Sequence, residues 1–302
     1  MAPLKHAILG VGGVGGVIGT FLAHLGDTVT AVVKAESLTN YPEQFHLEST
    51  FGTFDAPVSR DAEVPPCDVL WISVKATQLD TALQAITTPE RIRAIVPLLN
   101  GIDHLPLLRA KYGNDRVIAG TIAGEMERIA PGRFVHRTPF LRLNVSSSGR
   151  ALLGSTLDGL AKIGLECRFI DDEPTLMWGK LVFLAPIALA TTAADQTVGG
   201  IMSDPAWRQQ WEGCVREACA VAMAEGATVD AEAVLSGVPK MPGAMRSSMQ
   251  KDVEQGNPPE LAAIAAPIIV RGNARGIEVI ATERLAEAVA ERAARVPVRS
   301  QR

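Results

Sequence analysis

At 302 residues, the chain is long enough for two compact domains and too long for one small module. It is 47% hydrophobic and 21% charged, so it can bury a sizeable core, which excludes a disordered scaffold. The formal net charge is −4 and no run of Lys and Arg exceeds a pair, so we expect no binding to nucleic acid.

The cysteines show neither a C-x-x-C pair nor a spacing typical of metal ligands. We therefore expect buried thiols in a reducing compartment, no metal site and a cytoplasmic protein. The four cysteines are Cys67, Cys167, Cys214 and Cys219.

Two apolar segments resemble membrane or targeting signals. The first runs from residue 8 to residue 25, but it contains six glycines and no A-x-A cleavage signal follows it. The second, Leu181–Ala194, is shorter than the roughly 20 residues that a membrane-spanning helix needs. We expect both segments to be buried elements of a protein without a membrane anchor.

The first half of the chain alternates short aliphatic runs with segments of helical periodicity. The runs predict strands at Ala7–Leu9, Thr28–Val33, Val69–Val74 and Ile95–Leu99. The periodic segments predict helices at Gly13–Leu25, Gln78–Ala85 and His104–Tyr112. This alternation predicts a doubly wound parallel sheet of the Rossmann type. Further strands are expected at Val117–Ile122 and Phe134–Val145, the second with a more antiparallel character.

Strand signals end near Thr175, and the remaining segments predict helices. These are Leu176–Ala194, Pro205–Glu225, Ala231–Leu235, Ala244–Gln255, Pro259–Asn273 and Ala281–Val296. The expected fold class is therefore α/β, with an N-terminal Rossmann-type domain and an all-helical C-terminal domain. We expect the Rossmann-type domain at residues 1–171 and the helical domain at residues 172–302.

A G-x-G-x-x-G motif directly follows the first predicted strand. In a dinucleotide-binding fold the first glycine permits a tight turn, the second lets the pyrophosphate approach the backbone, and the third lets the helix pack closely on the strand. The pyrophosphate then lies at the helix N-terminus, where free N–H groups favour anions. The predicted cofactor-binding residues of this loop are Gly10, Val11, Gly12, Gly13, Val14 and Gly15.

The end of the second predicted strand bears on the choice of cofactor. An NAD-preferring fold places Asp or Glu there to accept a hydrogen bond from the ribose 2′-hydroxyl. This strand ends instead with Lys34, which can pair with a 2′-phosphate and so favours NADP(H). Glu36, two residues later, argues in the opposite direction.

Three further motifs resemble the ketopantoate reductase (2-dehydropantoate 2-reductase) family: a buried strand followed by Lys75, the Asn100-Gly101 pair after the next strand, and Lys180 within an apolar helix. Together with the glycine loop, the resemblance covers about residues 6–294. It implies NADPH-dependent reduction of a 2-oxo acid to a 2-hydroxy acid. Ketopantoate, reduced to pantoate in pantothenate biosynthesis, is the first candidate substrate.

The resemblance also implies roles for individual residues. Lys180 matches the proton donor of the family, and its apolar neighbours should desolvate it and lower its pKa. Lys75 and Asn100 match positions beside the cofactor, and Asn100 also faces the substrate. Glu260 matches a group that accepts a hydroxyl proton or orients Lys180, and Ser248 a group that binds the substrate carboxylate. Met126 matches a backbone contact to the cofactor only loosely, because its loop is longer here.

The sequence departs from the family at the wall of the substrate site. The family carries asparagines one and two turns after its catalytic lysine, where this chain has Leu184 and Ala188. A third asparagine position is occupied by Val198. Each lost amide partner should weaken binding of a polar substrate by roughly 1–3 kcal/mol. An alternative reading is therefore an oxidoreductase of the same family acting on a more apolar substrate.

A third reading is a nonenzymatic NADP(H)-binding sensor with a decayed pocket, although Lys180, Ser248 and Glu260 argue against it. The helical half also carries many alanines and other apolar residues in 262–269, more than one bundle needs, so we expect a homodimer. The family often forms one as well.

Overall fold

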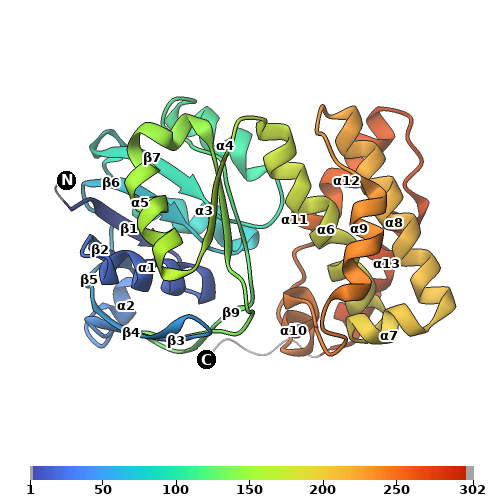
Figure 1. Ribbon diagram of the computed structural model, residues 1–302, viewed down its shortest axis with the longest axis horizontal. Helices are drawn as coiled ribbons and strands as arrows, with labels where there is room; N and C mark the ends of the chain where they lie inside the picture. Colours follow the sequence, from blue (N-terminus) through green and yellow to red (C-terminus); the bar gives the residue numbers. More distant parts are fainter. Residues whose placement is uncertain (1–2, 297–302) are drawn as a thin grey trace. The chain divides into compact units, whose positions relative to one another are not determined.

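The computed structural model describes residues 3–296 (Figure 1). Contacts divide the chain into two compact units. The first comprises the residues up to Leu99 together with His104–Leu176, and the second comprises Asn100–Asp103 and the chain from Met177 onward. The short loop at residues 100–103 therefore clusters with the helical unit, although it directly follows a strand of the first.

The first unit contains a five-stranded sheet in which all neighbouring strands are parallel. Its order is β5-β2-β1-β6-β7, formed by β5 (Ser59–Asp61), β2 (Thr28–Val32), β1 (Lys5–Leu9), β6 (Cys67–Ile72) and β7 (Ile92–Pro97). The chain builds outward from β1 to β5 and then returns to the other side of β1. The order thus reverses between β1 and β6, which confirms the predicted Rossmann-type fold and defines its switch point.

Two smaller sheets complete the first unit. One has the order β4-β3-β10-β9, from β4 (Gly52–Pro57), β3 (Gln44–Ser49), β10 (Arg133–His136) and β9 (Met126–Ala130). The other has the order β12-β11-β8, from β12 (Glu166–Ile170), β11 (Arg142–Ser146) and β8 (Gly120–Ala123). The prediction of one strand over Phe134–Val145 was wrong: this segment belongs to two strands in different sheets. Pro139 interrupts it because it has no N–H for a ladder.

The helices of this unit are α1 (Gly13–His24), α2 (Ala35–Leu38), α3 (Leu79–Ala82), α4 (His104–Tyr112) and α5 (Arg150–Ile163). Of these, α2 and α5 were not predicted. Helix α1 contacts strands of both the parallel sheet and the β4-β3-β10-β9 sheet. A Cβ atom on Gly16 would lie 2.0 Å from the Phe134 ring, and one on Gly13 would lie 2.3 Å from the Met126 carbonyl oxygen. The glycine-rich composition of α1 thus allows two sheets to pack closely against it.

The second unit consists of helices, as predicted. They are most of α6 (Glu173–Ala194), then α7 (Val198–Ser203), α8 (Pro205–Ala224), α9 (Ala231–Gly237), α10 (Ser248–Glu254), α11 (Leu261–Ile264), α12 (Ala266–Ala274) and α13 (Ile280–Arg295). The carboxylate of Asp204 accepts hydrogen bonds from the N–H groups of Ala206 and Trp207 and caps α8. Helix α8 packs on α12 and α13, and Trp211 and Cys214 of α8 are fully buried.

Two helix predictions in this unit need correction. The helix expected from Ala244 begins only at Ser248, where the Ser247 hydroxyl accepts a hydrogen bond from the Gln250 N–H and caps α10. The single helix expected over Pro259–Asn273 is broken into α11 and α12. Pro267 explains the break, since it has no N–H to donate to the carbonyl of Ala263.

Helix α6 is longer than the sequence pattern indicated. With 22 residues and an apolar stretch of mean hydropathy 1.5, it has the length and composition of a membrane-spanning helix, so the expectation that it is too short was wrong. However, 72% of that stretch is buried inside the fold. The apolar character of α6 is therefore explained by its burial as a core helix.

All four cysteines are free thiols. Cys67, Cys214 and Cys219 are buried, whereas Cys167 is only half-buried, which corrects the expectation for that residue. Burial raises the pKa of Cys67, Cys167 and Cys214 to about 12 and that of Cys219 to about 11. The thiols are therefore protonated, and poorly nucleophilic, at neutral pH.

The packing of α1 predicts the effect of adding a single methyl group. Gly16→Ala should lower the free energy of unfolding by roughly 1–3 kcal/mol, because the new methyl group collides with Phe134. Urea denaturation followed by circular dichroism measures this change. The control is Gly154→Ala in α5, where the added Cβ would meet no described atom within 4 Å apart from its chain neighbours and the backbone of its own helix. Since alanine favours a helix more than glycine does, this variant should be unchanged in stability or slightly more stable. Equal effects of the two substitutions would contradict the packing argument.

Candidate functional site

The glycine motif forms a tight loop between β1 and α1. Gly10 has a φ of +99°, and its carbonyl accepts a hydrogen bond of 2.9 Å from the Gly12 N–H. A Cβ atom on Gly15 would lie 2.3 Å from the Gly10 carbonyl oxygen and 2.3 Å from the Ser73 hydroxyl oxygen. By contrast, a Cβ atom on Gly12 would meet no described atom within 4 Å. The loop is thus closed toward the sheet and open above Gly12, as the motif requires.

The loop leads into the N-terminus of α1, whose first N–H groups have no side-chain cap in the described chain and no acidic residue in the first turn. Such a helix end favours an anion. The open approach at Gly12 and the uncapped N–H groups together fit the pyrophosphate of a dinucleotide. Val11 is buried and Val14 half-buried, so these two side chains anchor the loop in the core.

Neighbouring residues support the loop, and two of them were not predicted. The Ser73 hydroxyl, just after β6, donates a hydrogen bond of 2.8 Å to the Gly10 carbonyl. The Arg128 guanidinium on β9 donates one of 3.4 Å to the Val11 carbonyl. The structure also places Met126 here, since its carbonyl lies against Gly13. A polar residue at the end of the strand next to β1 was a usable signal for Ser73, whereas Arg128 had none.

Lys34 follows β2 and is 81% exposed. Its ammonium nitrogen lies 3.9 Å from a carboxylate oxygen of Glu36, which is also exposed. Exposed pairs of this kind contribute little free energy, about 0–1 kcal/mol, so either side chain can be redirected toward a ligand. Lys75 follows β6, is half-buried, and its carbonyl accepts a hydrogen bond from the Gln78 N–H. It lies after a strand bordering the switch point of the parallel sheet.

Within the second unit, the structure brings Asn100, Glu260 and Lys180 together. The Asn100 side-chain amide donates a hydrogen bond of 3.3 Å to a carboxylate oxygen of Glu260. Glu260 is buried, and it precedes α11 without using its side chain as a helix cap. Its backbone carbonyl instead accepts hydrogen bonds from the N–H groups of Ala263 and Ile264. The carboxylate thus contacts the Asn100 amide and acts on Lys180 through its charge.

Lys180 lies in α6 with buried Trp178 and Leu181 beside it in the chain. Burial lowers the pKa of Lys180 to about 8, and the negative charge of Glu260 acts in the opposite direction. Its pKa thus lies within reach of neutral pH, where an ammonium group can donate a proton. This shift was predicted from the apolar sequence around the lysine.

Ser248 is exposed at the first position of α10, and no hydrogen bond of its hydroxyl is found in the described chain. The adjacent Ser247 is instead buried, with its hydroxyl oxygen 2.8 Å from that of Thr191 on α6. Ser247 therefore fixes the start of α10 against α6, and Ser248 is left facing outward.

Leu184 and Ala188 follow Lys180 at intervals of four residues, so they share its face of α6. Leu184 is half-buried and Ala188 is buried. Val198 is also buried, at the start of α7. All three positions at which the family resemblance implies an asparagine are therefore occupied by aliphatic side chains, which have no amide group.

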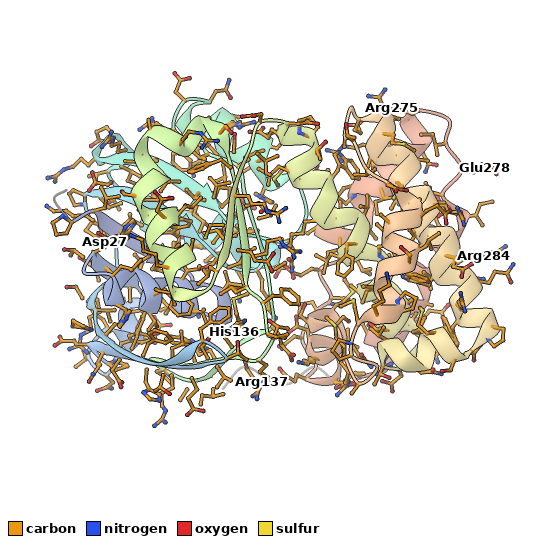
Figure 2. All side chains as sticks on the ribbon, in the orientation of Figure 1. Asp27, His136, Arg137, Arg275, Glu278 and Arg284 are labelled. Carbon is orange, nitrogen blue, oxygen red and sulfur yellow. The ribbon has the colours of Figure 1, made fainter. Side chains whose placement is uncertain are left out.

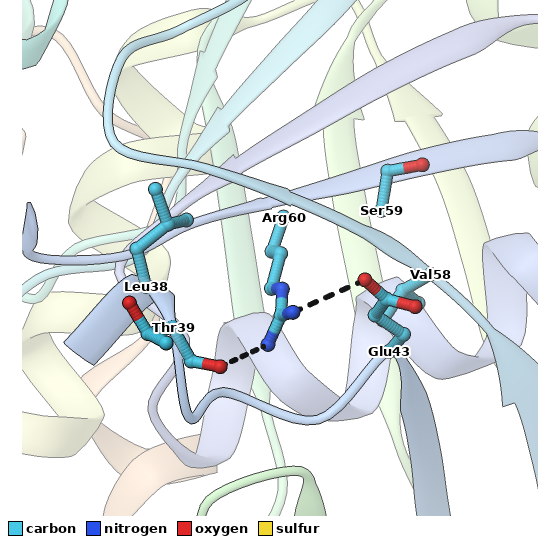
Figure 3. Close-up of a pocket in the computed structure, with 6 residues that line it drawn as sticks. All are labelled: Leu38, Thr39, Glu43, Val58, Ser59 and Arg60. Atoms are coloured by element: carbon cyan, nitrogen blue, oxygen red, sulfur yellow. Dashed lines mark hydrogen bonds and ion pairs between the residues drawn. The ribbon is translucent and has the colours of Figure 1, made fainter.

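A hollow of about 620 Å³ lies elsewhere in the first unit (Figure 3). It is lined by Leu38, Thr39, Glu43, Val58, Ser59 and Arg60, none of which is a predicted site residue. The Arg60 guanidinium donates to the Thr39 carbonyl and pairs with Glu43, so its charge is already engaged by the protein. The predicted site residues lie instead in the glycine loop of the first unit and in the Lys180 cluster of the second.

These two groups of residues define the class: a dinucleotide-binding fold followed by a helical unit with a lysine of lowered pKa. Comparison with known families supports this class. The family described as "Ketopantoate reductase PanE/ApbA" matches residues 6–148, and its C-terminal counterpart matches residues 174–293. The chain belongs to the ketopantoate reductase family, whose members are oxidoreductases.

Individual relatives agree with this assignment. A 2-dehydropantoate 2-reductase of Caulobacter vibrioides is 28% identical over 281 residues, which cover 90% of this chain and 93% of the relative. The fold is similar to that of D-mandelate dehydrogenase in a ternary structure with NADH and anilino(oxo)acetate, with a TM-score of 0.83, 20% identity and coverage of 96% and 99%. It is also similar to that of a dimeric ketopantoate reductase from Staphylococcus aureus, with a TM-score of 0.78, 20% identity and coverage of 96% and 99%.

The burial of Lys180 and the charge of Glu260 predict the pH at which the Lys180 ammonium group loses its proton. Lys180 should titrate near pH 8, and Glu260→Gln should shift its midpoint to lower pH, because the carboxylate that stabilises the ammonium form is removed. NMR titration of protein with isotopically labelled lysine measures the midpoint, with Lys180→Arg identifying the resonance. Glu254→Gln is the control, since Glu254 pairs with Arg246. A midpoint near the 10.4 of an exposed lysine would refute the desolvation of Lys180.

Proposed function

We propose that this protein is an NADPH-dependent oxidoreductase that reduces a 2-oxo acid to a 2-hydroxy acid. The observation that carries the proposal is Lys180, whose pKa is lowered to about 8 beside the buried carboxylate of Glu260. Ketopantoate is the first candidate substrate, which would place the reaction in pantothenate biosynthesis. Membership of the ketopantoate reductase family supports this choice.

A bound nicotinamide would supply the hydride for the reduction. As the hydride reaches the carbonyl carbon, negative charge develops on the carbonyl oxygen, and the Lys180 ammonium group gives that oxygen a proton. Glu260 keeps the lysine protonated, and Asn100 orients the Glu260 carboxylate through its amide. Because Lys180 must be protonated to act, the rate of reduction should fall as the pH rises above about 8.

On the cofactor side, the glycine loop and the N-terminus of α1 would hold the pyrophosphate, with Met126 and Lys75 beside the cofactor. Lys34 would pair with the 2′-phosphate. Ser248, exposed at the start of α10, would bind the substrate carboxylate. We further propose a homodimer formed through the helical unit. Many residues of 262–269 are buried in the unit's own core, but Met223, Val270 and Ile280 leave apolar surface on α8, α12 and α13.

One observation favours a second candidate substrate. The aliphatic face formed by Leu184 and Ala188 beside Lys180 offers no hydrogen-bond partner to the hydroxyl group of ketopantoate. It suits a 2-oxo acid with a branched or aromatic side chain. The likeness in fold to D-mandelate dehydrogenase is consistent with such a substrate, since mandelate carries a phenyl ring.

Turnover and cofactor binding together test the proposal. We expect NADPH consumption with ketopantoate, 2-oxoisovalerate or phenylglyoxylate, and we expect Lys180→Ala to lower kcat by roughly 100-fold or more. Binding of NADPH, followed by its fluorescence, should change little in that variant, while Lys240→Ala on an exposed turn should leave both unchanged. Ranking of the three acids by kcat/KM separates the two substrate candidates. Binding of NADPH without turnover of any 2-oxo acid would instead support a sensor.

The pairing of Lys34 with Glu36 predicts the cofactor preference. Lys34→Ala should raise the Kd of NADPH by roughly tenfold and leave that of NADH unchanged, because only NADPH carries the 2′-phosphate. Glu36→Gln should tighten NADPH binding, since it removes the competing carboxylate. Fluorescence titration with both cofactors measures these constants, and Lys162→Ala on α5 is the control. Equal losses for NADPH and NADH would place Lys34 outside the 2′-phosphate site.

A further inference from the structure

We propose that Arg271 is a positioning residue that fixes the loop Asn100–Asp103 and thereby holds Asn100 against Glu260. The proposal rests on the proposed function for its consequence in catalysis, but its structural part stands independently. It assigns a role to a residue of α12 that carried no signal in the sequence.

The loop approaches α11 closely at Gly101. Gly101 has a φ of +84°, and a Cβ atom there would lie 2.3 Å from the carbonyl oxygen of Ala263. Pro267 has no N–H to donate to that carbonyl, so the break between α11 and α12 leaves it facing the loop. Only glycine allows the chain to pass at this distance. The position of Asn100 thus depends on how firmly the loop stays on this part of the helical unit.

Arg271 provides the second attachment of the loop. Its Nη2 lies 2.5 Å from Oδ1 of Asp103, the last residue of the loop. The guanidinium is itself held by Glu225, with Nε 3.3 Å from Oε2, and by the carbonyl of Pro267, 3.4 Å from Nη1. It also lies over the ring of Trp178 at 5.9 Å. These contacts hold the Arg271 guanidinium in place, with its Nη2 group directed at Asp103 of the loop.

These contacts connect the residues of the site. Trp178 lies two residues before Lys180 on α6, and Asp103 lies three residues after Asn100. The bond from the Asn100 amide to Glu260 is 3.3 Å long, at the weak end of the range for a hydrogen bond. A small shift of the loop would break it and would leave the buried Glu260 carboxylate without this donor. Since displacements of about 1 Å can lower rates by 10²-fold, the clamp at Asp103 should affect catalysis.

A matched control lies one helical turn away. Arg275, labelled in Figure 2, bonds to the same Glu225 carboxylate at 2.7 Å. Its contacts within residues 3–296 include neither Asp103 nor Trp178. A role confined to the ion pairs of Glu225 would make Arg271→Ala and Arg275→Ala equivalent, whereas a role in positioning the loop separates them.

Hydrogen exchange tests the structural part without any substrate. In Arg271→Ala and in Asp103→Asn, amide exchange in the peptide spanning residues 100–104 should accelerate by roughly fivefold or more, as expected for a loop that opens locally. Arg275→Ala should leave that peptide unchanged, and Arg271→Lys, which keeps the charge, should lie between the two. Unchanged exchange of this peptide in Arg271→Ala would overturn the proposal.

Kinetics test the catalytic part. Arg271→Ala should lower kcat by roughly tenfold and leave the Kd of NADPH unchanged, with partial recovery in Arg271→Lys. The double variant Asp103→Asn/Arg271→Ala should be no slower than either single variant, because both remove the same contact. A loosened loop with unchanged kcat would overturn the positioning role. If the wild-type protein reduces no 2-oxo acid, the proposed function fails, and hydrogen exchange alone decides whether Arg271 holds the loop.

Discussion

The packing of the first unit depends on the close approach of the α1 backbone to the two sheets on either side of it. Gly15 brings the helix against the Gly10 carbonyl and Ser73, which closes the loop on the parallel sheet. On the opposite side, Gly13 and Gly16 admit the Met126 carbonyl and the Phe134 ring of the second sheet. The dinucleotide motif accounts for only part of this glycine content. The remainder follows from packing one helix between two sheets, where any side chain would separate the layers.

The composition of the strands explains which parts of the first unit could be predicted from the sequence. Strands β1, β2, β6 and β7 are mostly buried and rich in aliphatic residues, so their composition identifies them directly. Strands β3, β4 and β9 carry charged and polar residues, so no apolar run distinguishes them from loops. The β3–β4 and β9–β10 hairpins are local, but the pairing of β3 with β10 that joins them into one sheet is distant in sequence. Helix α5 was missed for a different reason, since its glycines and serine weaken the helical pattern.

The same distinction applies to the candidate site. The glycine loop and Lys180 stand out because a local rule makes them unusual: a fixed glycine spacing in one case and a charge within an apolar helix in the other. The resemblance to a known family added Asn100 and Glu260, whose contact spans 160 positions of sequence. Arg128 and Arg271 act through contacts with distant residues, and an arginine at those positions is ordinary for an exposed or half-buried site. Only the folded chain shows what they bind.

The acidity of Lys180 depends on two opposing effects. An ammonium group is stabilised by charges and by oxygen dipoles around it, so burial favours the neutral amine and lowers its pKa. The Glu260 carboxylate acts in the opposite direction and favours the ammonium form. Because the Asn100 amide donates to the same carboxylate, the residues that hold Asn100 in place also bear on the charge that Lys180 experiences.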